Sequence, residues 1–266
     1  MQQVPVEAIA ITRASTLFWV FAICAILIAG QRWQRARSFR DRMLRQWKRS
    51  LATALLYVLG MGIGGIGFFS VYPIAIFCQA MIGLALAYSI AGFEPLPVTQ
   101  AVIRHQNRIE SVGLMVATAM AVVVAALVVG SVLSSVIVPM FGESNGNPQG
   151  VASFFPNAWQ GFFLLLAGAG IGEESIYRLV CVSLFWRLTR RRWFAIIISA
   201  LLFGAYHLSP LDAMYRLFWE RPISIFITAT VMGIVMGYVY VKRGFETAVL
   251  GHTLGDWIPF LLSRAA

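Results

Sequence analysis

The feature that most constrains this chain is a run from Leu51 to Phe93 that contains no charged residue. A membrane-spanning helix needs about 20 consecutive apolar residues, so this run is long enough for two. The whole chain is 59% hydrophobic and only 12% charged. These features predict an all-α polytopic membrane protein whose residues 1–266 form a single membrane domain, with no room for a sizeable soluble domain.

The apolar runs predict about eight transmembrane helices in one bundle. Spans one to four lie within residues 1–150 and spans five to eight within residues 151–266. Residues 1–31 lack the basic N-terminal region of a signal peptide and a clear cleavage site made of small residues. These absences disfavour a cleaved signal peptide. The expected spans are 14–31, two within 51–93 that separate near 70–73, then 112–136, 159–185, 193–207, 223–240 and 248–262.

Residues 32–49 carry eight Lys or Arg side chains and one acid, Asp41. Apolar residues recur there at spacings of three and four, which predicts a basic amphipathic helix on an anionic membrane face. If this segment is cytoplasmic, the loops on the cytoplasmic side contain sixteen Lys and Arg residues, and those on the outer side contain four. Cytoplasmic loops are rich in these residues, so we expect both termini outside the membrane.

The formal net charge of +10 does not indicate nucleic-acid binding. The basic residues fall in short clusters between apolar runs, and no compact basic domain exists to carry such a function. Cys24, Cys78 and Cys181 each stand in an apolar segment without paired spacing. They therefore predict neither a disulfide framework nor a zinc knuckle.

Span five contains a charged stretch, with Glu173, Glu174 and Arg178 inside an otherwise apolar segment. Ionisable groups at bilayer depth are costly and indicate a functional site. Glu174 and Arg178 are four residues apart and share a helix face. This pair is either part of a catalytic site or a buried ion pair that fixes helix packing.

Two further pairs of residues occur at the same spacing, Phe203 with His207 in span six and His252 with Asp256 in span eight, and Phe203 by itself is expected to be a core residue. Each pair projects from one helix face. Three polar faces can meet only in the interior of the bundle. A lone His207 would indicate a hydrogen-bonded interior histidine, but together with Glu173 and His252 it indicates a functional site.

The three motifs stand on helices five, six and eight, and their order resembles the CAAX protease and bacteriocin-processing family. This family includes the type II CAAX prenyl endopeptidases. The motifs that carry the resemblance are Glu173-Glu174-x-x-x-Arg178, Phe203-x-x-x-His207 and His252-x-x-x-Asp256. The resemblance covers about residues 159–262, and residues 1–150 contribute only a compatible topology.

The resemblance implies an intramembrane peptidase in which Glu173 and His207 activate water. It also implies that His252 and Asp256 assist at the oxyanion. Its substrates would be lipidated or transmembrane peptides reached through membrane lipids. We accordingly expect an integral, multi-pass protein of the cytoplasmic membrane of a prokaryote.

The chemistry also follows from the residues themselves, because peptide hydrolysis needs an activated water, oxyanion stabilisation and a proton for the leaving amine. Adjacent helical residues point about 100° apart, so Glu174 can pair with Arg178 while Glu173 faces the other helices as general base. An ionised Asp256 would repel an oxyanion. We therefore expect Asp256 to orient His252 instead.

Several alternatives stay open. Glu173, His207 and His252 could supply three zinc ligands, although there is no H-E-x-x-H motif, and we expect no cofactor. Ser175 lacks a G-x-S-x-G elbow and is expected to pack or to bond a backbone carbonyl. A proton-coupled transporter would also bury Glu, Arg and His, and a catalytically silent scaffold could share the fold.

Overall fold

A computed structural model describes residues 33–65, 72–144, 157–209, 212, 218 and 220–265. These residues form helices and no strand, which confirms the predicted all-α class for this part of the chain. The helices are α2 (Trp33–Arg45), α3 (Trp47–Ile63), α4 (Tyr72–Ala87), α5 (Pro97–Ile103), α6 (Arg108–Phe141), α8 (Ala158–Leu165), η1 (Leu166–Glu173), η2 (Ser175–Val182), α9 (Ser183–Thr189), α10 (Arg192–His207), α12 (Pro222–Arg243) and α13 (Phe245–Ala265).

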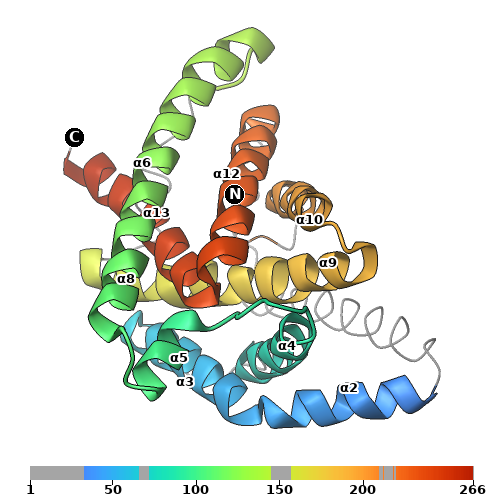
Figure 1. The fold of residues 1–266 in the computed structure, drawn as a ribbon. Helices are drawn as coiled ribbons and strands as arrows, with labels where there is room; N and C mark the ends of the chain where they lie inside the picture. The colour runs from blue at the N-terminus through green and yellow to red at the C-terminus, as the bar shows by residue number, and fades with distance from the viewer. Residues whose placement is uncertain are drawn as a thin grey trace.

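The segments α8, η1, η2 and α9 follow one another directly and form one long rod through the middle of the molecule (Figure 1). Helices α3 and α4 pack against this rod on one side, and α10 and α13 pack against it on the other. The predicted span five is therefore the central helix of the bundle, with the other two motif-bearing helices in contact with it.

Two glycines let neighbouring helices approach the rod closely. A Cβ atom on Gly83 of α4 would lie 2.9 Å from the carbonyl carbon of Leu179. A Cβ atom on Gly170 of η1 would lie 3.2 Å from the carbonyl oxygen of Val249 in α13 and even closer to the Thr253 hydroxyl. Small residues at helix contacts permit such close backbone approach.

In the described part of the chain, α6 and α12 are long and apolar enough to cross a membrane, and α4 and α10 are shorter apolar helices. The exposed residues Val124, Val128 and Val132 form an apolar stripe at a spacing of four along α6. Such a stripe suits contact with acyl chains. The prediction of eight spans is not confirmed, and the expected span 14–31 lies outside the described residues.

Helix α5 lies between the expected spans that end at residue 93 and begin at residue 112, where no helix was predicted. Its first turn begins at Pro97, a residue favoured at this position. The carboxylate of Glu246 in α13 accepts hydrogen bonds from the backbone nitrogens of Val98 at 3.3 Å and Thr99 at 2.7 Å. A distant side chain therefore caps this helix, which local sequence could not indicate.

The predicted basic amphipathic helix is confirmed as helical over α2. Its Phe39 side chain is buried against Leu86 of α4 and against Val180 and Leu184 of the central rod. Leu44, also on α2, is exposed. Part of the apolar face thus packs on the protein itself, and contact of the rest with a membrane surface stays a prediction.

Glu143, which follows α6, has a structural role. The carboxylate of Glu143 accepts hydrogen bonds from the backbone nitrogens of Ile223 at 2.6 Å and Ser224 at 3.1 Å, at the start of α12. Residues 145–156 lie outside the described residues, as do most of residues 210–219. Cys78 and Cys181 form no disulfide within the described residues, and Cys24 falls outside them.

Several chain segments meet at the opposite end of α12. The Phe93 ring packs on Trp186 and Tyr240, with both pairs of ring centroids 5.2 Å apart. The backbone nitrogen of Phe245 donates to the carbonyl oxygen of Pro95 at 2.7 Å. The arginines after α9 and the basic end of α12 therefore share one end of the bundle. Helix α10 starts at this basic end and runs away from it to His207.

Candidate active site

The central rod has π-helical hydrogen bonding on both sides of Glu174. The segment η1 ends at Glu173 and η2 begins at Ser175. Spacing had predicted an ordinary α-helix here, because periodicity over a short apolar segment does not separate the two helix types. π-Helical turns are rare and occur frequently at functional sites. The pair Glu174 and Arg178 nevertheless still shares one face, as the spacing predicted.

Glu174 and Arg178 form a fully buried ion pair in which Nε of the arginine lies 3.2 Å from Oε2 of the glutamate. Within the described residues, no nitrogen of this guanidinium has a hydrogen-bond partner. Its Cζ atom lies 4.9 Å from the centroid of the Phe203 ring. A carboxylate and an aromatic face thus compensate the buried charge, through ion pairing and a cation–π contact.

The second oxygen of Glu174 meets His252 of α13, with Oε1 2.8 Å from Nδ1. A carboxylate that is paired with Arg178 can only accept hydrogen bonds, so Nδ1 of His252 is the donor. This contact requires α13 to lie against η1, and Gly170 provides the space for it. Glu174 therefore fixes the orientation of the His252 ring, the role that we expected of Asp256.

The other edge of His252 faces two more carboxylates. Its Nε2 lies 3.5 Å from Oδ2 of Asp256 and 3.9 Å from Oε2 of Glu173. The side chain of Glu174 is fully buried, whereas those of Glu173 and Asp256 are 21% and 45% exposed. The two adjacent glutamates therefore differ in access, and only Glu173 retains accessible surface.

His207 ends α10 with Nδ1 2.8 Å from the carbonyl oxygen of Phe203. A carbonyl only accepts, so Nδ1 carries the proton and Nε2 is left for another partner. The Phe203 ring lies edge-on to both histidines, 4.5 Å from the His207 ring and 5.7 Å from the His252 ring. Electrostatic interactions also connect His207 with Glu173 and Asp256.

The structure therefore brings together all seven residues that the sequence analysis singled out. Phe203 belongs to this cluster through its contacts with Arg178, His207 and His252, although sequence alone would assign an apolar aromatic residue to the core. Ser175 is buried and donates to the carbonyl oxygen of Gly172 at 2.8 Å. This bond matches the structural role that we expected of Ser175.

Sequence reasoning did not select Asp212, which lies between α10 and α12. Its side chain is buried, and it interacts electrostatically with Glu173 and Tyr177. The residue was missed because it lies outside the predicted spans. The available signal was an acidic residue in an otherwise aromatic-rich connection.

The alternative of a zinc site concerns side chains of this same cluster. In the parts of the chain with described coordinates, no group of three His, Cys, Asp or Glu side chains is arranged to hold one. Glu173, His207 and His252, the three zinc ligands considered above, do not form such a group.

Fold and site together define the class of protein: a bundle of apolar helices that encloses a cluster of carboxylates and histidines from three of them. Residues 155–258 match the family described as type II CAAX prenyl endopeptidase Rce1-like. This segment contains all three motifs, and its match supports assignment of the chain to the CAAX protease and bacteriocin-processing family, a family of integral membrane proteases. No curated protein and no solved structure matches the chain.

Proposed function

We propose that this protein is an intramembrane endopeptidase in which Glu173 activates the attacking water. Its substrate is a peptide bond near the C-terminus of a lipidated or membrane-inserted protein. The observation that carries the proposal is the difference in burial and contacts between the two adjacent glutamates. Glu174 is buried and engaged by Arg178 and His252, whereas Glu173 is accessible and faces Nε2 of His252.

In the proposed reaction, a water molecule donates one hydrogen bond to Glu173 and one to Nε2 of His207. Glu173 takes a proton as the water oxygen adds to the carbonyl carbon of the scissile bond. His252, as the imidazolium, donates from Nε2 to the oxyanion that forms. Collapse of the tetrahedral intermediate breaks the C–N bond, and the proton held by Glu173 passes to the leaving amine.

The supporting residues act through their neighbours. Glu174 holds Nδ1 of His252 and thereby aims Nε2 at the reacting group. Arg178 compensates the charge of Glu174, and Phe203 separates the two imidazole rings. Asp256, 3.5 Å from Nε2 of His252, is a positioning residue for that edge of the ring.

The substrate reaches the site laterally from the lipid, because the motif helices are embedded in an apolar bundle. We place the protein in the cytoplasmic membrane of a prokaryote, as a multi-pass protein with both termini outside. The arrangement of arginines at one end of the bundle supports this orientation.

The proposal is tested with purified protein in detergent, using a prenylated C-terminal peptide and a transmembrane peptide as substrates. We expect cleavage by the parent protein and by Glu110→Gln, which removes an exposed carboxylate on α6. We expect Glu173→Gln to lower the rate by about 10²- to 10⁴-fold, the usual contribution of a general base. Cleavage at the parental rate by Glu173→Gln would refute the assignment, and transport without cleavage would refute the protease function.

A further inference from the structure

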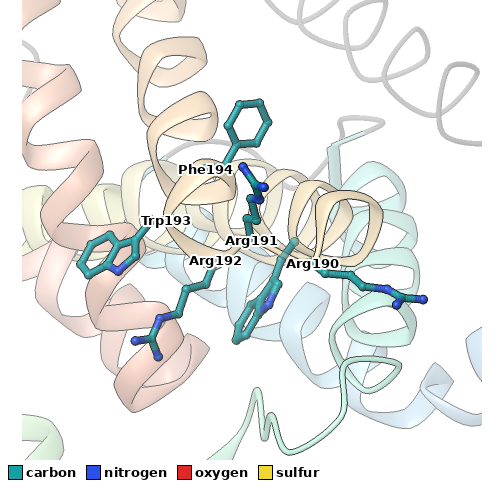
Figure 2. A pocket seen from close by; sticks show the side chains of 6 residues that line it. Arg190, Arg191, Arg192, Trp193 and Phe194 are labelled. Atoms are coloured by element: carbon teal, nitrogen blue, oxygen red, sulfur yellow. The ribbon is translucent and has the colours of Figure 1, made fainter.

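A second polar site lies at the turn between α9 and α10, where a cavity of about 480 Å³ opens (Figure 2). It is lined by Trp186, Arg190, Arg191, Arg192, Trp193 and Phe194. Arg192 begins α10 and His207 ends it, and at 1.5 Å per residue the two are about 22 Å apart along the helix. The cavity is therefore separate from the candidate active site.

The arginines of this cavity carry charge that the described protein does not neutralise. Arg190, Arg191 and Arg192 are all exposed, and none of them pairs with a carboxylate in the described residues. Guanidinium groups form paired, charge-assisted hydrogen bonds with phosphate oxygens. Three consecutive arginines at one turn thus favour an anionic ligand.

An apolar ridge continues from the cavity along α10. Trp193, Phe194, Ile197 and Leu201 are exposed, and the last three recur at spacings of three and four, so they share one helix face. The Trp193 ring also stacks on Tyr238 of α12, with the ring centroids 5.7 Å apart. Tryptophan and tyrosine concentrate at the level of lipid headgroups, which places the cavity at the membrane interface.

The shape of the site distinguishes between possible anions. Figure 2 shows the three arginine side chains fanning out around the turn, with Trp193 and Phe194 beside them, rather than converging on one point. A small free ion would engage few of these groups and would leave the ridge unused. A phospholipid would use both, because its charged headgroup and its acyl chains are covalently joined.

We propose that the α9–α10 cavity binds the headgroup of one anionic phospholipid, whose acyl chains lie along the α10 ridge. The phosphodiester and any further anionic group accept hydrogen bonds from the arginines. The aromatic rings cover the glycerol region. Basic pockets between membrane helices are known to take such headgroups. The proposal does not depend on the protease function.

The test compares two variants that each lose three positive charges. One is Arg190→Gln/Arg191→Gln/Arg192→Gln, and the matched control is Arg104→Gln/Lys242→Gln/Arg243→Gln. The control residues are exposed near the same end of the bundle but do not line the cavity. Each full-length protein is purified from mixed phosphatidylglycerol and phosphatidylcholine vesicles, and native mass spectrometry counts the lipids that it retains.

We expect the parent and the control to retain one phosphatidylglycerol and the cavity variant to bind it at least about ten-fold more weakly, since losing even one charge-assisted contact changes affinity by about that factor. Equal retention by both variants, or equal retention of phosphatidylcholine, would overturn the proposal. Displacement of the lipid by excess inorganic phosphate would show a free-anion site instead. The variant Arg190→Lys/Arg191→Lys/Arg192→Lys keeps the charge but not the paired hydrogen bonds, so it should retain more lipid than the Gln variant and less than the parent, which separates lost binding from misfolding.

Discussion

Nδ1 of His252 lies 2.8 Å from Oε1 of Glu174, although 78 residues separate the two in the chain. The same glutamate binds Arg178 through its other oxygen. One buried carboxylate therefore links a histidine of α13 to a guanidinium of the central rod. This relationship makes Glu174 both a structural residue and a positioning residue, and it separates the consequences of changing the two adjacent glutamates.

Changing Glu174 to Gln should impair stability as well as activity. The change leaves Arg178 as an unpaired buried charge, which costs about 3–5 kcal/mol in known cases. It also exchanges the ionic acceptor at Nδ1 of His252 for a neutral one. Thermal unfolding in detergent and peptide cleavage measure the two effects. Glu173→Gln is the control, because it should lose activity with little change in melting temperature.

The double variant Glu174→Gln/Arg178→Met tests the same relationship further. Removing both charges should restore much of the unfolding free energy, since a buried pair replaced by neutral groups often costs little. Activity should stay low because His252 has lost its orienting carboxylate. A double variant as active as the parent would contradict the positioning role of Glu174.

Gly170 should be intolerant of even one methyl group. In Gly170→Ala the new Cβ atom would collide with the Thr253 hydroxyl and would lie 3.2 Å from the Val249 carbonyl oxygen, which pushes α13 and His252 away from the rod. We expect a destabilisation of about 1–3 kcal/mol, typical of overpacking, and a lower cleavage rate.

Gly168→Ala is the matched control, because a Cβ atom there meets nothing within 4 Å. Combining Gly170→Ala with Thr253→Ala removes the colliding hydroxyl and should recover part of the lost rate. If Gly168→Ala and Gly170→Ala behave alike in unfolding and cleavage assays, close packing of α13 on the rod is not what positions His252.

Asp256→Asn should lower kcat by about ten-fold, less than loss of the general base, because Asp256 contributes only charge and position beside Nε2 of His252. KM and melting temperature should stay close to the parental values, since the side chain is 45% exposed. Asp256→Glu should recover part of the rate. An Asn variant as active as the parent would instead favour a direct hydrogen-bond donor at this position.

Glu246→Ala should destabilise the protein by about 1–2 kcal/mol without altering the chemistry, because the carboxylate caps two backbone nitrogens of α5. The measurement is the melting temperature in detergent, together with the cleavage rate at a temperature where the variant is folded. A stable variant with a lowered rate would show that Glu246 acts at the site rather than at the helix end.

Chelation tests the metal-free mechanism. We expect a zinc chelator to leave the cleavage rate unchanged, because Glu173 and the two histidines are proposed to act on water directly. A loss of rate that zinc restores would replace this mechanism with a metal-dependent one. Thermal unfolding with and without the chelator separates loss of a structural ion from loss of a catalytic one.

Local sequence was sufficient for the helices that carry the site. The expected span 193–207 corresponds to α10 at Arg192–His207, and the expected span 223–240 lies within α12 at Pro222–Arg243. Long apolar segments predict helices, because backbone groups that are buried away from water must form hydrogen bonds within their own segment. Charged residues and histidines are easily recognised within such apolar segments. A spacing of four residues predicts that two of them share a helix face.

Interactions between segments that are distant in the chain could not be predicted from these local patterns. Periodicity did not indicate that Glu174 rather than Asp256 holds Nδ1 of His252, that Glu246 caps α5, or that the central rod has π-helical turns. It also left Asp212 unnoticed, because that residue lies in a connection.

By itself, the sequence determined the all-α class, the helices that bear the three motifs and the residues that face one another within each helix. These properties depend on side chains close together in the chain. Tertiary structure alone decided which carboxylate is buried, which stays accessible and which partner each imidazole nitrogen meets. Those outcomes depend on the distances and rotations between packed helices, which glycine contacts and burial set across the whole bundle.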